Sequence, residues 1–363
     1  MGMRMEVIDH EFKRHGVINK YSMVQYTPKY NDVGSFQLSC ALNADNIDLI
    51  REDRILWIEG KYAGIIQYIS KSSDSEITVK GYLLSGMTKW RVVPATYEAY
   101  KDIQEIYRDL VTAGMITGDR VIPGVTYLSS VLSSEKIRFQ STGSQLADTF
   151  KTLGETYDYG FDIFLNMKEK SFDFTLYRGK DHTVGNKSGN KPVIFGTDFN
   201  NILSGSYVGN TQEYRNFAYV AGEGEGADRV VVEVSSQKPQ TGYFRREAYV
   251  DARDLQKNGS GQPLTDAEYK ELLQQRGLSS LSEYRKVESY EAELRTDKDS
   301  AFKYGVDYGL GDTVSIIDKT LGVIIPAKVT AATITFVDDG YTIEPTFGFG
   351  LPTLYEKLKK GVL

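Results

Sequence analysis

Ser35-Phe36-Gln37-Leu38-Ser39-Cys40-Ala41-Leu42 alternates polar and apolar side chains with a period of two. This alternation is typical of a β-strand with one buried face, so every second side chain from Phe36 onward would point into a core. Short strands at close spacing with turns between them predict a β-barrel or sandwich over residues 1–92. The neighbouring strand patterns lie at 6–9, 15–18, 22–26, 55–58, 62–69 and 76–83.

The pattern changes over residues 93–195. Apolar residues recur at helical spacing over 97–111, which predicts a helix. A second helix is predicted over 144–157, with Gly160 as its C-terminal glycine. Together with a hairpin pattern at the end of this region, the two helices predict an α+β domain.

Strand patterns dominate again from residue 196. A loop of alternating glycine and glutamate, residues 222–226, separates two of them and predicts a hairpin. We therefore predict a second barrel, built from residues 196–250 and 288–349. The strand patterns from the middle region onward lie at 161–165, 171–177, 214–221, 228–235, 241–250, 290–294, 314–317, 323–325, 331–337 and 341–344.

A helical insertion interrupts this second barrel. Thr265 and Glu268 have the spacing of a capping box, in which each side chain satisfies the other residue's backbone donor. Gly277 is expected to end that helix, and Ser280 to begin a shorter one. The predicted fold is therefore β-rich α+β, with two antiparallel β-barrel domains (1–92; 196–250 and 288–349), an intervening α+β domain (93–195), the helical insertion (251–287) and a C-terminal helix (350–363).

The composition narrows the possible functions. The chain has 363 residues and a formal charge of −6, whereas sequence-independent nucleic-acid binding needs a strong basic excess. One cysteine excludes an intrachain disulfide and a cysteine-rich zinc site, and three histidines leave little for another metal site. No apolar stretch approaches the length of a membrane span, and no apolar signal core follows Met1. The 25 tyrosines and 16 phenylalanines favour strands and broad contact surfaces.

Several polar residues could in principle belong to a catalytic or ligand-binding site, but the residues around them do not form a known motif. The spacing of a phosphate-binding loop, a calcium loop, a hydrolase triad or a metalloprotease helix is absent around each of them. We therefore predict no catalytic, cofactor-binding or metal-binding residue. The groups considered are Glu223 and Glu225, the loop 185–191, the set Asp251, Asp254 and Asn258, the histidines His10 and His15, and Cys40, which is expected to be a small core residue.

Arg246 stands out in the strand pattern 241–250. Alternation places it on the more apolar face, with Phe244 and Ala248. A half-buried arginine needs a carboxylate partner, and Asp251 or Asp254 in the following turn are the local candidates. The alternative is a strand end at which both faces are wet.

Five motifs, in order along the chain, resemble those of one protein family. They are Tyr30-Asn31-Asp32-Val33-Gly34-Ser35-Phe36-Gln37-Leu38, Ile77-Thr78-Val79-Lys80-Gly81-Tyr82-Leu83-Leu84-Ser85-Gly86 followed by Arg91, Tyr177-Arg178-Gly179-Lys180-Asp181-His182-Thr183, Arg245-Arg246-Glu247-Ala248-Tyr249-Val250-Asp251-Ala252-Arg253-Asp254, and Tyr304-Gly305-Val306-Asp307-Tyr308-Gly309-Leu310-Gly311-Asp312-Thr313-Val314. The chain thereby resembles the phage and prophage tail-hub proteins, a siphophage tail-tip group similar to the central hub of contractile baseplates.

The resemblance implies a fold and a role. Hub proteins carry two related barrels per chain and form a homotrimeric ring that joins the six-fold tail tube to the three-fold tip and lines the channel. The implied partners are further copies of the chain, a tail-tube or distal-tail ring protein, a tip spike or fibre protein and the tape-measure protein, with DNA only as passing cargo. The implied location is the virion tail, after synthesis in the host cytoplasm. The structural motif residues are Gly34, Phe36, Gly81, Arg91, Arg178, Gly179, Arg246, Glu247, Asp251, Gly311 and Asp312.

Two other functions remain open at this stage. Longer relatives carry peptidase, lysin or fibre modules, so a cell-wall hydrolase or peptidase is one alternative to a non-enzymatic hub. A carbohydrate-binding receptor module that uses the surplus tyrosines is the other, and it would need an exposed aromatic cluster with polar neighbours.

Overall fold

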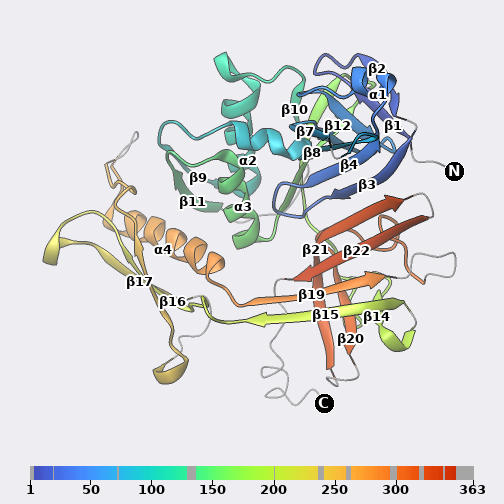
Figure 1. Ribbon diagram of the computed structural model, residues 1–363. Coiled ribbons are helices and arrows are strands. Elements are labelled where there is room, and N and C mark those ends of the chain that lie inside the picture. The colour runs from blue at the N-terminus through green and yellow to red at the C-terminus, as the bar shows by residue number, and fades with distance from the viewer. Residues whose placement is uncertain are drawn as a thin grey trace.

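The computed structural model describes residues 4–348 apart from 19, 72, 129–135, 200, 236–240, 259–262, 295–300, 319–322 and 338–339. Strands dominate the described residues, and four α-helices lie among them (Figure 1). The protein is β-rich, as the sequence predicts. The C-terminal helix predicted for 350–363 lies outside the described residues.

One antiparallel sheet runs through the molecule. Eight of its strands follow the order β15-β19-β22-β21-β3-β4-β8-β7, and each neighbouring pair is antiparallel. Four of these strands come from each end of the chain, so the N- and C-terminal parts share one sheet. Their bounds are β3 (Tyr21–Thr27), β4 (Ser35–Ala41), β7 (Tyr68–Lys71), β8 (Glu76–Tyr82), β15 (Ile202–Asn210), β19 (Val287–Leu294), β21 (Val323–Val337) and β22 (Gly340–Gly348).

This sheet corrects the prediction of two closed barrels. No sheet formed by the described residues closes on itself. Instead β3 pairs with β21, and their register places Tyr26 opposite Ile334. The Tyr26 ring also stacks on Phe336, with 6.3 Å between ring centres. Alternation identifies a strand and its buried face, but it does not name the neighbouring strand, because that depends on which segments share a core.

A smaller sheet packs against the apolar face of β3, β4 and β8. Its order is β2-β1-β5-β6, and Phe36 of β4 lies in the shared core. A Cβ on Gly64 would lie only 2.3 Å from Cδ1 of Phe36, so the two sheets approach this closely because glycine stands there. The elements of this layer are β1 (Met5–Ile8), β2 (Arg14–Ile18), α1 (Ala44–Leu49), β5 (Ile55–Ile58) and β6 (Tyr62–Ile65).

The C-terminal strands have their own core. The short strand β14 (Ile194–Gly196) pairs with β20 (Thr313–Asp318), which in turn pairs with the first half of β21. Phe195 of β14 contacts Phe347 of β22, with 5.7 Å between ring centres. β14 and β20 therefore extend the same sheet from the first half of β21 and share a core with β22.

The middle region folds around an aromatic core. Tyr107 and Phe150 stack with 4.6 Å between ring centres, and Phe161 and Phe174 lie in the same cluster. The predicted hairpin is confirmed, because β12 and β13 pair in antiparallel register. The elements are β9 (Tyr97–Asp102), α2 (Ile103–Val111), β10 (Val125–Leu128), β11 (Lys136–Ser141), α3 (Leu146–Tyr157), β12 (Gly160–Asn166) and β13 (Ser171–Tyr177).

Two details of this region differ from the prediction. The helix predicted over 97–111 begins only at Ile103, because the Asp102 side chain caps it by accepting from the Glu105 amide at 3.1 Å. Residues 97–102 instead form β9, which pairs with the distant strand β11. At the end of α3 the left-handed residue is Asp158, with φ 61°, whereas Gly160 begins β12.

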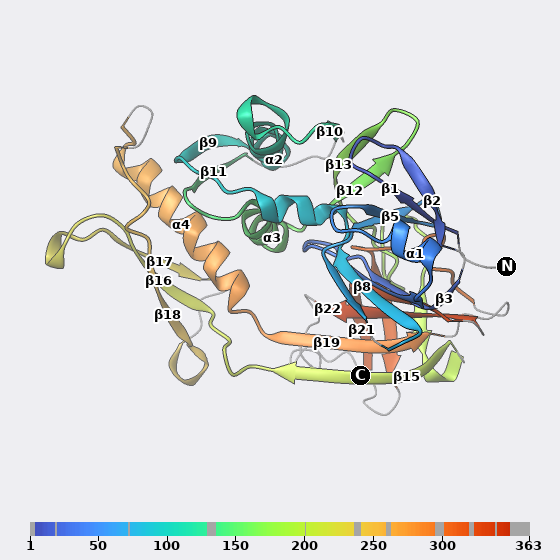
Figure 2. The same cartoon turned by 45° about the horizontal axis from the view of Figure 1, so that its top comes forward.

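A compact unit is inserted between β15 and β19. These two strands pair up to Asn210 opposite Val287, so the chain leaves and re-enters the sheet at adjacent positions. The inserted elements are β16 (Phe217–Ala221), β17 (Val231–Ser235), β18 (Glu247–Asp251) and α4 (Asp266–Glu283). α4 shares a core with the β17-β16-β18 sheet, and it also lies against α3 and β11 (Figures 1 and 2).

The helical prediction for this unit is right in part. The capping box is confirmed: the Glu268 amide donates to Thr265 Oγ1, and Glu268 Oε2 accepts from the Thr265 amide at 2.9 Å. Gly277 does not end the helix, and no second helix begins at Ser280, because α4 continues to Glu283. A Cβ on Gly277 would lie 2.7 Å from Cγ2 of Val234, so this glycine lets the helix pack closely on the sheet.

These contacts change the limits of the insertion. Tyr269, Leu273 and Leu281 of α4 are buried against the sheet, so residues 251–287 alone would not be an exposed helical appendage. We therefore propose that the inserted unit comprises residues 211–286, which we call the insert.

Asp162 is a buried carboxyl group in β12. It is 5% exposed, and burial raises its pKa to about 7, although hydrogen bonds from the Ile163 amide and from Ser85 lower it. The unfolded group titrates near 3.8, so the folded state binds the proton more tightly. Stability is therefore greatest below pH 4 as far as this group is concerned, and it falls as the pH rises towards 7.

We expect Asp162→Asn to stabilise the protein at pH 8 and to have little effect at pH 4. The interval between the two pKa values corresponds to an upper limit of about 4 kcal/mol. Urea unfolding of both proteins at the two pH values measures this difference. Asp173→Asn is the matched control: although burial raises its pKa, hydrogen bonds from Ser171, Thr126 and Asn166 hold that pKa below the usual value, so its loss should destabilise the protein at pH 8. Parallel pH profiles for wild type and Asp162→Asn would contradict the prediction.

Candidate assembly surface

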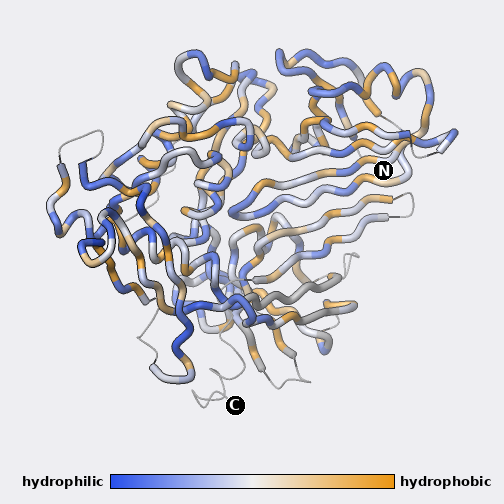
Figure 3. The backbone as a smooth tube through the Cα atoms, turned by 60° about the vertical axis from the view of Figure 1, so that its left-hand side comes forward, coloured by the Kyte–Doolittle hydropathy of each residue, from blue (hydrophilic) through white to orange (hydrophobic). Residues whose placement is uncertain are grey.

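The uncovered face of the large sheet is polar along its central strands, β21, β3 and β4. The alternation that sends Phe36 and Leu38 into the core places hydroxyl and amide side chains on the other side. In Figure 3 the colour of strands alternates along the chain between hydrophilic and hydrophobic residues. Gln25 donates to Thr335 across the β3–β21 junction at 3.1 Å. One cross-strand row contains, from β22 to β7, Thr342, Thr335, Gln25, Gln37, Lys80 and Tyr68.

The central part of this face carries no charge. Positions 333–337 of β21, 23–27 of β3 and 35–39 of β4 present only threonine, serine, glutamine, methionine and valine to this side. Hydroxyl pairs bridge the strands, such as Thr27 with Thr333 at 3.1 Å. A face of this kind binds water well and gives an extended polyanion neither a strong attraction nor a strong repulsion.

A shallow hollow of about 370 Å³ lies at the β7 side of the face. Tyr68 and Tyr82 are exposed there, at 54% and 38%. Lys80 lies over the Tyr68 ring at 6.0 Å from its centre. The hollow continues the polar face to the edge of the sheet.

Both outer edges of the eight-strand path are unpaired among the described residues. β15 forms one edge and β7 the other. The nine residues of β15 include no charged side chain, and Leu203 and Val208 are about half exposed. Monomeric proteins usually protect a long edge with charges or prolines, and β15 has neither, so an edge of this composition favours pairing with another chain.

The first group of motif residues holds close-packed backbone in place. A Cβ on Gly34 would lie 2.7 Å from Leu83 Cδ1, and one on Gly81 would lie 1.8 Å from the Ile65 carbonyl oxygen. Phe36 is 4% exposed and lies beside Gly81. These residues are required by packing within the N-terminal part.

Arg91 connects this part to the middle domain. Its Nε donates to the carbonyl oxygen of Gly114 at 3.0 Å, and its Nη2 donates to that of Arg120 at 3.0 Å. One guanidinium thus satisfies carbonyl groups from two turns, which is a positioning role.

A second group of motif residues joins three distant parts of the chain. Gly179 and Gly311 are in backbone contact, since a Cβ on Gly179 would lie 1.9 Å from the Gly311 carbonyl group. Asp312 Oδ1 accepts from the Lys180 amide at 2.6 Å. Tyr30 packs on Gly311, and its hydroxyl donates to the Asp158 carbonyl oxygen at 3.1 Å. We call this contact the glycine junction.

Arg178 borders the glycine junction. Its guanidinium lies 4.0 Å from the centre of the Tyr159 ring, and Nη2 donates to the Tyr157 carbonyl oxygen at 3.2 Å. The junction is thereby held against the end of α3.

The third group of motif residues lies in the insert and corrects the prediction for Arg246. Its Nη1 donates to the Thr211 carbonyl oxygen at 2.8 Å, and its guanidinium lies 5.7 Å from the centre of the Tyr214 ring. The carboxylates proposed as its partners bind other arginines: Asp251 binds Arg229 and the neighbouring Arg253, and Asp254 binds Arg276 of α4. Glu247 pairs with Arg245.

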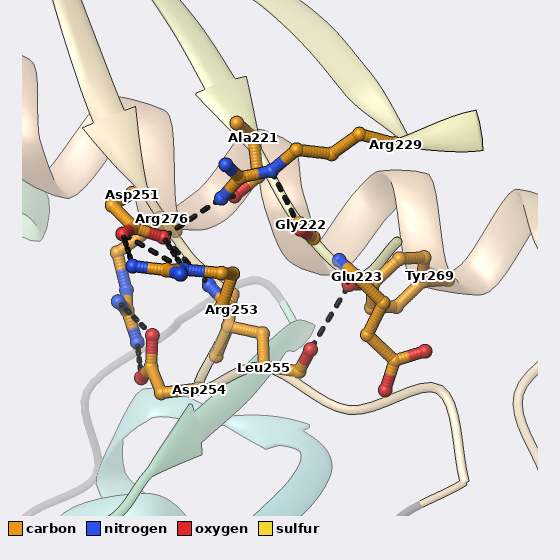
Figure 4. A network of polar contacts seen from close by, with 10 residues as sticks. All are labelled: Ala221, Gly222, Glu223, Arg229, Asp251, Arg253, Asp254, Leu255, Tyr269 and Arg276. Carbon is orange, nitrogen blue, oxygen red and sulfur yellow. Dashed lines mark hydrogen bonds and ion pairs between the residues drawn. The ribbon is translucent and has the colours of Figure 1, made fainter. Parts of the chain in front are cut away.

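Figure 4 shows these other arginines. Asp251 accepts from Arg229 at 2.8 Å and from Arg253 at 2.6 Å, and the bonds from Arg253 lower the pKa of Asp251 to about 2. Asp254 accepts from two guanidinium nitrogens of Arg276, at 3.0 and 2.7 Å. Both carboxylates are therefore neutralised within the insert.

The contacts and burial of other candidate residues from the sequence are as follows. Glu223 accepts from the Lys257 amide at 2.9 Å, and Glu225 is exposed in the 222–226 turn. His15 bonds to Asp9 at 2.8 Å. Cys40 is buried, which raises the pKa of its thiol to about 11.

Two further observations concern metals and membranes. Over the described ranges no group of three or more His, Cys, Asp or Glu side chains is arranged to hold a metal ion. Within the same ranges, no helix combines the length and apolar character that a membrane span requires.

Solved structures share this fold. The tail protein from Neisseria meningitidis MC58 has a TM-score of 0.58 at 14% identity, covering 96% of this chain and 97% of that chain. The 43 kDa tail protein of prophage MuSo2 from Shewanella oneidensis has a TM-score of 0.57 at 13% identity, with 95% and 98% covered. Prophage tail protein gp18 from Listeria monocytogenes EGD-e has a TM-score of 0.56 at 11% identity, with 99% and 98% covered. The fold is thus that of phage and prophage tail proteins.

The family match is more specific. Residues 4–349 match the model of the Siphovirus ReqiPepy6 Gp37-like proteins, so the chain belongs to this family. No curated protein matches the chain in sequence. The resemblance to phage and prophage tail proteins is confirmed.

Proposed function

We propose that three copies of this chain close into the hub ring of a phage tail, with the polar sheet face lining the channel. The observation that carries the proposal is a repeated strand order. Numbered along the chain, the N-terminal strands β3, β4, β7 and β8 lie in the order 1-2-4-3, and β15, β19, β21 and β22 lie in the same order. Each chain therefore contains two four-stranded units of one topology.

The repeat explains how the free edges would be paired. Within one chain, the third strand of the C-terminal unit, β21, pairs with the first strand of the N-terminal unit, β3. The same relation between copies places β7 of one copy beside β15 of the next. Directions alternate along all eight strands, so this new pair would also be antiparallel. Eight strands from each of three copies, 24 in all, would close the sheet and leave no edge.

Such a ring adapts one symmetry to another. Six similar four-stranded units around the axis suit a six-fold tail tube or distal-tail ring protein. The insert follows β15 only, whereas β3 and β4 are joined by the short segment 28–34, so the insert occurs three times per ring. One side of the ring would therefore present three-fold symmetry to a spike or fibre protein.

The channel surface fits the cargo. The polar face is uncharged at its centre, and the whole chain carries −6, so DNA would pass without strong binding. The tape-measure protein would occupy the same channel before DNA leaves. Localisation in the virion tail, after synthesis in the host cytoplasm, and a non-enzymatic role are parts of this proposal.

Engineered disulfides test the ring. Ser70→Cys in β7 is combined in turn with Leu203→Cys, Ser204→Cys and Val208→Cys in β15, and the variants are assembled into tails and oxidised. We expect at least one pair to give covalent trimers on non-reducing gels. The native Cys40 is buried and does not compete.

The control pair is Ser70→Cys with Ser279→Cys, because Ser279 lies in α4, away from the sheet edge. It should give no trimer. Tails that assemble normally but yield only monomers from every β7–β15 pair would overturn the proposal.

A further inference from the structure

The outer face of the insert carries exposed aromatic rings. The sheet β17-β16-β18 buries one face against α4, and its register places Tyr219, Tyr249 and Val231 on the other. Tyr249 is 65% exposed, and in the turn before β18 Tyr243 and Phe244 are 88% and 59% exposed. We call these five residues the aromatic strip. Exposed aromatic groups at this density on a soluble surface typically mark a contact site.

Arg245 holds the strip in position. Its guanidinium lies 3.4 Å from the centre of the Phe217 ring, and Nη2 donates to the Tyr219 hydroxyl at 2.8 Å. The Asn216 side chain donates to the Phe244 carbonyl oxygen at 2.8 Å, which fixes the turn. A surface organised in advance loses little entropy when it binds.

The charges around the strip indicate what it would bind. Arg245 pairs with Glu247, whereas Arg229 and Arg253 share Asp251, which leaves one positive charge in excess. In contrast, Glu225, Asp228 and Glu233 form no described ion pair, and all three are exposed. These three carboxylates outnumber the one excess arginine, so the net charge near the rings is negative, which complements a basic and apolar surface.

We propose that the aromatic strip docks a basic, apolar protein surface of the tail component next to the hub. This inference rests on the proposed ring. The insert lies beyond one end of β15 and β19 in both views, so the three strips of a ring would surround one opening (Figures 1 and 2). A three-fold partner at that opening would meet all three strips at once, and such multivalent contact strengthens weak individual sites.

A protein fits this surface better than a sugar does. Tyr243 and Tyr249 are 88% and 65% exposed, so these rings stand out from the surface instead of lining an enclosed hollow. Small ligands bind in concave sites that bury most of their surface, whereas an open sheet face suits a flat protein contact. Binding of a sugar to the strip is the competing hypothesis, and the crosslinking experiment below distinguishes it from protein binding.

Site-specific photocrosslinking in assembled tails tests the docking. The probe is p-benzoylphenylalanine at position 249, with the same residue at position 100 as a control, because Tyr100 is also exposed (52%) but lies in β9. We expect illumination to link position 249, but not position 100, to one different tail protein. Combined reversal of Glu225, Asp228 and Glu233 to lysine should lower the yield at least fivefold.

The outcomes separate this inference from the ring itself. Crosslinks only to a second copy of this chain, no crosslink, or a yield unchanged by charge reversal would each overturn the docking proposal. Competition by soluble host-wall polysaccharide that removes the crosslink would also overturn it, in favour of sugar binding. Disulfide formation between β7 and β15 is measured in the same particles. Covalent trimers without a crosslink from position 249 would refute the docking proposal and leave the proposed ring intact.

Discussion

Gly179→Ala is expected to abolish the soluble, folded protein. The added Cβ would lie 1.9 Å from both the carbonyl carbon and oxygen of Gly311. Neither backbone can yield: the Gly311 amide donates to the Val329 carbonyl oxygen at 2.8 Å, and the Lys180 amide is bound to Asp312. Gly311 also has φ +83° and Tyr30 packed against it. We expect a loss of more than about 4 kcal/mol, since a backbone clash cannot be relieved by a rotamer change.

Gly185→Ala is the matched control. Gly185 follows the same strand, has no atom within 4 Å of an added Cβ and does not need a positive φ. We expect this variant to melt within about 2 °C of wild type, since substitutions that touch nothing have small effects. Soluble yield, circular dichroism and thermal melting compare the two. A Gly179→Ala protein that melts close to wild type would show that the glycine junction is not rigid.

Removing residues 251–286 is expected to unfold the insert, whereas removing the whole insert should preserve the rest of the chain. The first deletion takes α4 from the sheet and exposes Val220, Val234 and their neighbours to water. Several large apolar side chains lose burial at about 1.5–3 kcal/mol each, more than a three-stranded sheet can tolerate. The second deletion joins Asn210 to Val287 through Asn-Gly, the preferred two-residue hairpin turn.

The second deletion needs two accompanying substitutions. Arg138 pairs with Glu268, and Glu155 pairs with Arg285, so removing the insert would take this ion-pair partner from each. In the intact chain their side chains are 12% and 10% exposed, and a charge that stays partly buried without its partner is costly. Arg138→Gln and Glu155→Gln avoid this cost.

Yield and denaturant unfolding decide between the two deletions. The expected result is a soluble β protein with a cooperative transition for the whole-insert deletion, and aggregation for the deletion of 251–286. Aggregation of both would show that the insert is part of the main core. A stable protein from the shorter deletion would show that α4 is an exposed appendage that the sheet of the insert does not need.

The sequence alone determined most of the local structure. Side-chain alternation located strands such as β4 and β12, because the period of two is set by the backbone itself. The capping box at Thr265 and Glu268 located the start of α4 for the same kind of reason, since its bonds join residues three apart. The ordered motifs pointed to tail proteins, which the family match confirms.

Only the tertiary structure decided which strands pair with one another and which side chains meet. Residues 97–102 satisfy a helical stripe, yet they form a strand because β11, which begins 34 residues after the end of β9, supplies its hydrogen bonds. Glycine is common just after a helix end, but Gly277 lies within α4, where the missing side chain lets the helix pack closely on Val234. The carboxylates expected for Arg246 bind Arg253 and the more distant Arg229 and Arg276 instead. The polar face and the two free edges appear only when β21 joins β3, because strand pairing is a contact between residues about 300 positions apart and no local pattern encodes it.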